Sequence, residues 1–92
     1  MPFVGANIIV KGVVQGVGFR YWTVRKAQNY DLGGWTRNLS DGTVEIEVEG
    51  ERGIIEEFIK ELKVGPTYSQ VTDLAINWYE KPRGYTDFNV EF

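Results

Sequence analysis

The chain has 92 residues, 42% of them hydrophobic and 14% aromatic, so it fits one small domain with a modest core and is too apolar for a disordered protein. It contains no cysteine and no histidine, which excludes disulfides, thiolate metal sites, histidine-based catalysis and histidine-ligated zinc. Its net charge of −3 is uneven: residues 1–40 hold five basic residues against one acidic residue, and residues 41–92 hold five against twelve. The excess of basic residues within residues 1–40 fits a site for a small anionic ligand, and the negative net charge of the whole chain disfavours a broad nucleic-acid-binding surface.

The first predicted elements are a strand over residues 3–14 and a helix over residues 19–30. Alternating apolar residues lead into a short glycine-containing connection, after which apolar residues recur at a spacing of three and four. The end of the helix leaves two possibilities open. Either Gly33 adopts the left-handed turn that ends the helix, or Asp31 tolerates it at a cost of ~1 kcal/mol.

A hairpin is predicted next. Residues 34–39 form its first strand, residues 40–42 its short connection, and residues 44–49 its second strand. In the second strand apolar residues alternate strictly with glutamates, which predicts one buried face and one solvated face. The glutamates are Glu45, Glu47 and Glu49.

The last elements are a helix over residues 54–63, a strand over residues 70–79 and a short strand over residues 88–92. The helix carries apolar residues at i, i+3, i+4 and i+7, and Gly65 with Pro66 ends it. The order strand, helix, strand, strand, helix, strand predicts an α+β fold. We expect a two-layer ferredoxin-like βαββαβ sandwich over residues 1–92, with an antiparallel sheet, both helices on one face and a short extra C-terminal strand.

The connection before the first helix has the composition of an anion site. Gly16 and Gly18 free the backbone from the Cβ penalty, so successive N–H groups can face one concavity, and the helix start adds unpaired donors. Such a nest binds anions, above all phosphate. The spacing fits neither a Walker A motif nor a dinucleotide fingerprint, because Phe19, Arg20 and Tyr21 follow the last glycine. Arg20 can hold two phosphate oxygens with its planar fork. From the glycines alone, an ordinary strand-to-helix turn is the alternative.

Two separate motifs resemble the signatures of the acylphosphatase family. Residues 10–20 read Val-Lys-Gly-Val-Val-Gln-Gly-Val-Gly-Phe-Arg and resemble the first signature. Residues 34–38, Gly-Trp-Thr-Arg-Asn, and residues 41–44, Asp-Gly-Thr-Val, are similar to the second. The resemblance extends over nearly the whole chain. Its further matches are Gly50, Gly65, Pro66, Phe88, Val90 and Phe92.

The resemblance implies hydrolysis of an acyl phosphate to a carboxylate and inorganic phosphate, with no cofactor and no metal. It implies that Arg20 binds the phosphoryl group and stabilises charge on its oxygens. Asn38 would hold the attacking water, since its amide can accept from that water and donate to a phosphoryl oxygen. The carboxylate leaves readily, so positioning and charge stabilisation suffice without histidine, and the substrate's phosphate is the implied proton acceptor. The amides implied to complete the phosphate cradle are those of Gln15, Gly16, Val17, Gly18 and Phe19.

Each assignment has a structural alternative. Arg20 could form a surface ion pair at a helix start, and Asn38 could cap the turn that follows it. The glutamate row could suggest a divalent metal, but any solvated strand face shows this spacing, so we expect no metal. The chain departs from the family pattern at Asp31, Thr36 and Thr67, and these departures concern local packing.

The main functional alternative is a non-catalytic ferredoxin-like binding module for a small anionic ligand or RNA. RNA binding would require aromatic and basic residues on the open sheet face, where the glutamates stand. A second alternative is a domain of a larger carbamoylation system, although the start at Met1 and the end soon after the last strand favour a free-standing enzyme. No signal-peptide pattern and no apolar run of ~18 residues is present, so we expect a cytoplasmic monomer without membrane contact.

Overall fold

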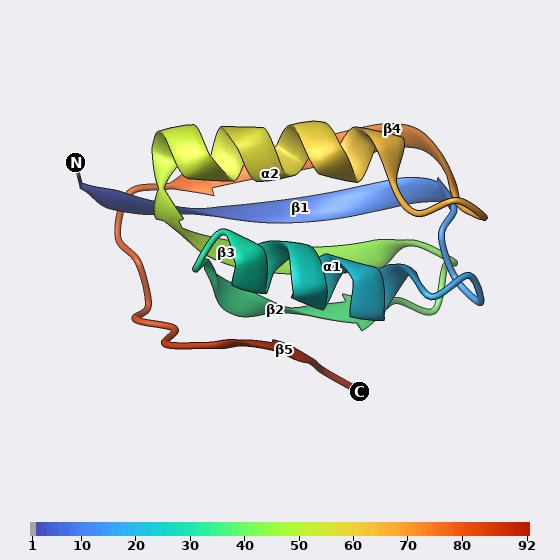
Figure 1. The fold of residues 1–92 in the computed structure, drawn as a ribbon, viewed down its shortest axis with the longest axis horizontal. Coiled ribbons are helices and arrows are strands. Elements are labelled where there is room, and N and C mark those ends of the chain that lie inside the picture. Colours follow the sequence, from blue (N-terminus) through green and yellow to red (C-terminus); the bar gives the residue numbers. More distant parts are fainter. Residues whose placement is uncertain (1) are drawn as a thin grey trace.

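A computed structural model describes residues 2–92, and its elements follow the order expected from the sequence (Figure 1). The elements are β1 (Phe3–Val13), α1 (Phe19–Asn29), β2 (Gly33–Asn38), β3 (Val44–Glu51), α2 (Arg52–Val64), β4 (Gln70–Tyr79) and β5 (Phe88–Val90). The predicted and observed elements differ only at their ends. No helix within residues 2–92 is long and apolar enough to cross a membrane.

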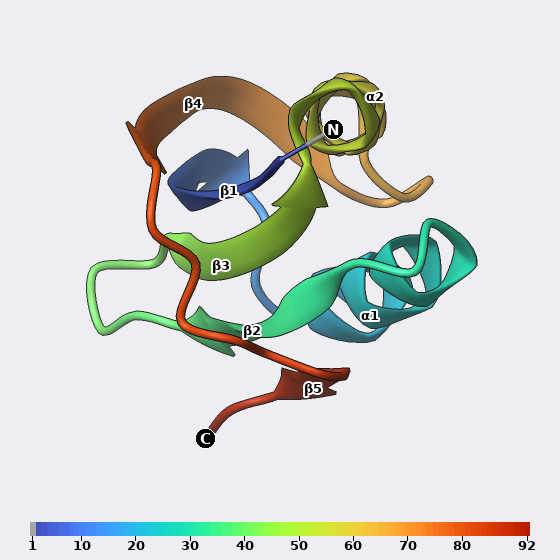
Figure 2. The same ribbon diagram turned by 90° about the vertical axis from the view of Figure 1, so that its left-hand side faces the viewer.

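The five strands form one sheet in the order β4-β1-β3-β2-β5. The four longer strands pair antiparallel, as expected, whereas β5 adds to β2 in parallel, so the sheet is mixed. Both helices lie on one side of this sheet, as Figure 2 shows. The expected ferredoxin-like βαββαβ sandwich is therefore confirmed.

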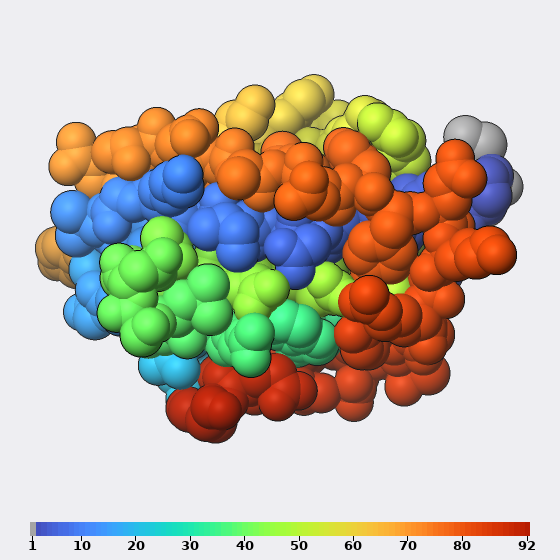
Figure 3. All heavy atoms as spheres, turned by 180° about the vertical axis from the view of Figure 1, so that it is seen from behind, coloured from blue at the N-terminus to red at the C-terminus, as the bar shows by residue number. Residues whose placement is uncertain are grey.

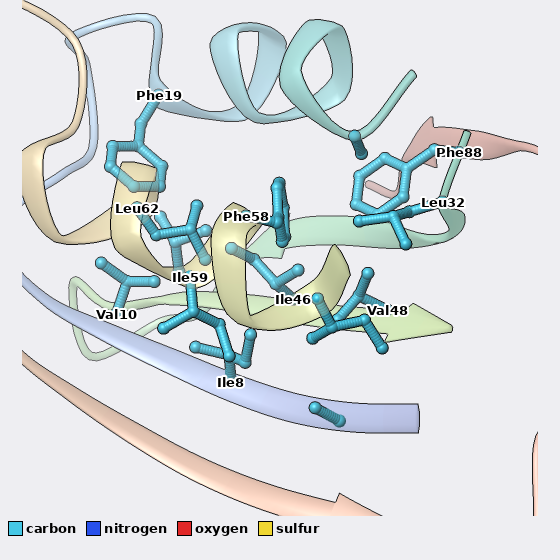
Figure 4. Close-up of a cluster of buried hydrophobic side chains, with 14 of the residues drawn as sticks. Ile8, Val10, Phe19, Leu32, Ile46, Val48, Phe58, Ile59, Leu62 and Phe88 are labelled. Atoms are coloured by element: carbon cyan, nitrogen blue, oxygen red, sulfur yellow. The ribbon is translucent and has the colours of Figure 1, made fainter. Parts of the chain in front are cut away.

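The core lies between the helices and the sheet (Figure 4). Alternate residues of β1 and β3 reach it because side chains along a strand alternate between the two faces. The apolar stripe of α2 covers them, and the rings of Phe58 and Phe88 meet edge-on at 6.4 Å, which fastens the short β5 to the core. Each large apolar side chain buried here contributes roughly 1.5–3 kcal/mol. Fully buried members are Ala6, Ile8, Val10, Val44, Ile46, Val48, Ile55, Phe58 and Leu62.

The end of α1 settles the question left open by the sequence. Asp31, not Gly33, takes the left-handed conformation, with φ 55°. The N–H of Leu32 then reaches back to the carbonyl of Ala27 at 2.9 Å, which closes the helix and turns the chain into β2. The second helix ends at Gly65, with φ 72°, as predicted.

The expectation of a solvated glutamate face on β3 is wrong. Glu47 and Glu49 are each only 3% exposed, because the segment between β4 and β5 crosses this side of the sheet (Figure 3). The carboxylate of Glu47 accepts a hydrogen bond from Asn7 at 2.9 Å and pairs with the guanidinium of Arg83. Asn7 also donates to Glu45 at 2.9 Å. Glu47 and Glu49 are therefore buried and hydrogen-bonded, and only Glu45 remains partly exposed.

Glu49 anchors the covering segment most directly. Its carboxylate accepts the backbone N–H groups of Arg83, Gly84 and Tyr85 at 2.6, 3.0 and 3.2 Å, and the Tyr79 hydroxyl at 2.9 Å. Burial raises the pKa of Glu49, but these four hydrogen bonds to the ionised form outweigh it and hold the pKa below its usual range. The pKa of Tyr79 is raised, mainly by burial and secondly by the hydrogen bond to Glu49.

Candidate active site

The connection between β1 and α1 is built on two left-handed glycines. Gly16 has φ 74° and Gly18 has φ 77°, a region that side chains rarely adopt. No atom lies within 4 Å of where a Cβ would stand at either position, so the need for glycine is conformational and not steric. Left-handed residues at alternate positions turn successive N–H groups toward one side of a loop.

The donors of this loop have no partner within the described part of the chain. Within residues 2–92, the backbone N–H groups of residues 15–19 donate no hydrogen bond to another group. The first backbone bond of the helix runs from the N–H of Trp22 to the carbonyl of Gly18 at 3.1 Å, and the first turn holds no acidic residue. Free N–H groups and the positive end of the helix dipole therefore meet at one place, which is suited to an anion.

Arg20 is the second residue of α1 and is half-buried. No carboxylate within residues 2–92 forms an ion pair with its guanidinium, so the alternative of a surface ion pair is not what the structure contains. The guanidinium lies over the ring of Phe92, with Cζ 5.4 Å from the ring centroid. Within residues 2–92, no carboxylate therefore neutralises its charge.

The side chain of Gln15 connects this loop to the turn between β2 and β3. Its Nε2 donates to the carbonyls of Leu39 at 2.8 Å and of Thr43 at 2.9 Å. The same two residues close the turn through the bond from the N–H of Leu39 to the carbonyl of Thr43 at 2.9 Å. Loop and turn therefore lie together at one end of the sheet (Figure 1). The sequence assigned only the backbone amide of Gln15, and no local pattern points to partners 24 and 28 residues away.

Asn38 ends β2, directly before this turn. It lies on the helix-covered face with Thr36, because Trp35 and Arg37 point to the opposite face, where they contact Tyr85 and Glu45. Asn38 is thus on the side of the sheet that carries α1 and Arg20. Its Oδ1 atom is turned inward, is buried and has no hydrogen-bond partner within residues 2–92.

Asp41, and not Asn38, caps the turn. The carboxylate of Asp41 accepts the hydroxyl of Thr43 at 2.6 Å and its N–H at 3.0 Å. These hydrogen bonds lower the pKa of Asp41, and the bond from the Thr43 hydroxyl has the larger effect. The turn is therefore stabilised without Asn38, which leaves that side chain free for another role.

Comparisons with known proteins agree with this architecture. The model of the acylphosphatase family matches residues 6–90. The chain is 44% identical over 84 residues to an acylphosphatase of Chlorobaculum tepidum, a match that covers 91% of each chain. It is 43% identical over 90 residues to an acylphosphatase of Moorella thermoacetica, covering 98% of this chain and 96% of that one. The crystal structure of acylphosphatase from Bacillus subtilis superposes with a TM-score of 0.95 at 37% identity, covering 97% and 99% of the two chains.

The chain belongs to the acylphosphatase family. The family expected from the two motifs is confirmed, and so is the expectation of an enzyme of the hydrolase class.

Proposed function

We propose that the protein hydrolyses acyl phosphates, and that the amides of residues 15–19 and the guanidinium of Arg20 hold the phosphoryl group. One observation carries this proposal: the loop offers a row of donors with no internal acceptor, next to an arginine with no ion pair within residues 2–92. A phosphoryl group with charge on three oxygens matches such a concavity, and a bidentate guanidinium adds charge-assisted hydrogen bonds.

In the proposed reaction, the oxygen of a water molecule attacks phosphorus on the side opposite the acyl oxygen. The new P–O bond forms as the bond to the acyl oxygen breaks, and the electron pair of that bond leaves with the carboxylate. The proton released by the water passes to a phosphoryl oxygen. No step needs a protein acid or base, because a carboxylate is a good leaving group and Asn38 is not a base at neutral pH.

Asn38 is the residue proposed to place the water. Since Oδ1 is turned inward, the Nδ2 group is the half of the carboxamide that can serve the site. With Oδ1 buried, the amide does not accept from the water as the resemblance implied; its two N–H bonds instead donate to the attacking oxygen and to a phosphoryl oxygen, which aligns one with the other. The Gln15 side chain supports this arrangement because it holds the turn that follows Asn38.

The deciding assay compares benzoyl phosphate with an ordinary ester, phenyl phosphate. We expect turnover of the first and no measurable turnover of the second, because only the acyl phosphate has an activated leaving group. Cleavage of neither would favour a non-catalytic anion-binding module, and equal cleavage of both would contradict the proposed dependence on the leaving group.

RNA binding on the sheet is the weaker candidate. The sheet face away from the helices does carry Trp35 and Arg37, but Arg37 is paired with Glu45, Arg83 is paired with Glu47, and the segment after β4 crosses the face. These paired arginines and buried carboxylates disfavour the open basic and aromatic surface that RNA binding requires. All residues proposed for the reaction come from the β1–α1 loop, α1 and β2 of one chain, which supports action as a monomer. We also propose that it acts in the cytoplasm, without a membrane or nucleic-acid partner.

A further inference from the structure

Three buried polar atoms stand out beside the proposed site. They are Oγ1 of Thr23 in α1, Oγ1 of Thr36 in β2 and Oδ1 of Asn38 at the end of β2. None has a hydrogen-bond partner within residues 2–92, and both threonines are fully buried. Buried polar atoms in folded proteins are nearly always hydrogen-bonded, to protein or to an ordered water, so a partner for each of these three is expected.

The fold brings the three residues to one interface. Thr36 and Asn38 lie on the same face of β2, two residues and therefore about 7 Å apart along the strand. α1 packs across β2 and runs in the opposite direction, with Thr23 on its buried face (Figure 1). Thr23 lies about 9 Å before the end of α1, and Thr36 lies about 10 Å after the start of β2. Because the chain reverses direction between α1 and β2, the two threonines lie opposite each other along the helix–strand interface.

The geometry suits one water molecule and not a direct bond. The backbones of Thr36 and Asn38 are about 7 Å apart, which is too far for a direct hydrogen bond. A water between the two side chains, with a hydrogen bond of about 2.8 Å on each side, bridges most of this distance, and the side chains extending inward cover the rest. A buried water typically makes about three hydrogen bonds, and here two hydroxyls and one amide oxygen are available. A helical threonine usually bonds to the carbonyl four residues earlier, and Thr23 does not, so its hydroxyl is free for this role.

We propose that Thr23, Thr36 and Asn38 enclose one buried water, which fixes the Asn38 carboxamide with Oδ1 inward and Nδ2 toward the reacting phosphoryl group. Thr36 is then a positioning residue for hydrolysis: it acts through the water on Asn38 and does not touch the substrate. This inference rests on the proposed function. It also gives a role to the Thr36 hydroxyl, at a position where the resemblance leads one to expect a small apolar residue.

The test compares Thr36→Val, which removes the hydroxyl at nearly constant shape, with Thr36→Ser, which keeps it. Thr72→Val, on the exposed part of β4, is the matched control. For Thr36→Val we expect kcat with benzoyl phosphate to fall roughly tenfold, with KM and phosphate affinity unchanged and Tm slightly lowered, because the buried water loses one partner. Thr36→Ser should recover most of kcat. In an Asn38→Ala background, Thr36→Val should have no further effect, because the only group that it positions is gone.

Turnover of Thr36→Val close to that of the unchanged protein, or a loss that adds fully to that of Asn38→Ala, would overturn the inference. Should Thr36→Val fail to fold, a high-resolution crystal structure of the unchanged protein decides: water within hydrogen-bond distance of all three side chains supports the inference, and its absence there refutes it. Failure of the proposed function itself is distinguishable, since the unchanged protein would then not hydrolyse benzoyl phosphate.

Discussion

Two segments at opposite ends of the sheet direct backbone N–H groups toward an anion site, and we call them cradles (Figure 1). They serve different purposes. In the segment after β4, the N–H groups of Arg83, Gly84 and Tyr85 converge on the carboxylate of Glu49. In the loop between β1 and α1, the N–H groups of residues 15–19 have no acceptor within residues 2–92. The first cradle holds an anion supplied by the chain and fastens the fold, whereas the second is open within residues 2–92, and we propose that it binds a phosphoryl group from solution.

The largest effect is expected from removing the cation of the open cradle. Arg20→Ala should lower turnover of benzoyl phosphate by roughly a thousandfold, since the charge that develops on the phosphoryl oxygens loses its strongest partner. Unfolding should stay cooperative, because Arg20 forms no ion pair within the part of the chain that the structure describes. Arg25→Ala, an exposed arginine on the same helix, is the control and should retain turnover. Near-normal turnover of Arg20→Ala would refute the assignment.

Asn38→Ala separates water placement from phosphate binding at the same cradle. We expect kcat to fall roughly a hundredfold while the affinity for inorganic phosphate stays within about twofold, because the amides and Arg20 are untouched. Steady-state kinetics with phosphate as a competitive inhibitor measures both quantities. A loss of phosphate affinity at unchanged kcat would count against water placement. Asn89→Ala, exposed on β5, is the control.

Gln15→Ala tests whether the open cradle depends on its link to the β2–β3 turn. Two hydrogen bonds are lost, so we expect kcat to fall roughly tenfold and the free energy of unfolding by about 1–2 kcal/mol. Gln15→Glu cannot donate to the two carbonyls and adds a negative charge beside the loop, so it should also weaken phosphate binding. Gln28→Ala, on α1, is the control. Unchanged kcat in both Gln15 variants would show that the link has no functional role.

Emptying the filled cradle should change stability and leave the reaction intact. Glu49→Ala leaves three N–H groups and the Tyr79 hydroxyl without their acceptor, so we expect the free energy of unfolding to fall by about 3 kcal/mol. Turnover of the folded variant should stay within about twofold, because Glu49 lies far from the loop. A large loss of kcat in a folded variant would mean that the two cradles are coupled.

The pH dependence of the filled cradle has a definite sign. Because the pKa of Glu49 is lower in the folded state, its stabilisation is present above the unfolded pKa and is lost as pH falls through the folded pKa. The difference in unfolding free energy between the unchanged protein and Glu49→Gln should therefore shrink in acid. Denaturant unfolding at a series of pH values measures it, with the exposed Glu91→Gln as control. A difference that grows in acid would contradict the lowered pKa.

No effect is expected from a chelator. Within residues 2–92, no group of three or more acidic side chains is placed to hold a metal ion, and the proposed reaction uses none. The assay with benzoyl phosphate should run at the same rate with and without EDTA. A rate lost to EDTA and restored by magnesium would overturn the proposed mechanism.

The loop with left-handed Gly16 and Gly18 could be located from the sequence, whereas the cradle around Glu49 could not. Gly16, Gly18 and the helix start indicate the β1–α1 loop because the conformation of this loop is determined by residues within a few positions of one another. The burial of Glu47 and Glu49 depends on a covering segment more than thirty residues away, which has no periodic pattern, so strand alternation alone wrongly predicted a solvated face. The hydrogen bonds of the Gln15 side chain were not predicted for the same reason, because their partners come together only in the folded structure.

Whether the amides of residues 15–19 bind the phosphoryl group can be measured by an NMR titration of the protein with inorganic phosphate. We predict saturable shifts in the backbone amide signals of residues 15–19, with the amides of residues 83–85 unmoved because Glu49 already occupies them. Shifts that do not saturate, or that fall outside the loop and leave it unchanged, would contradict the account.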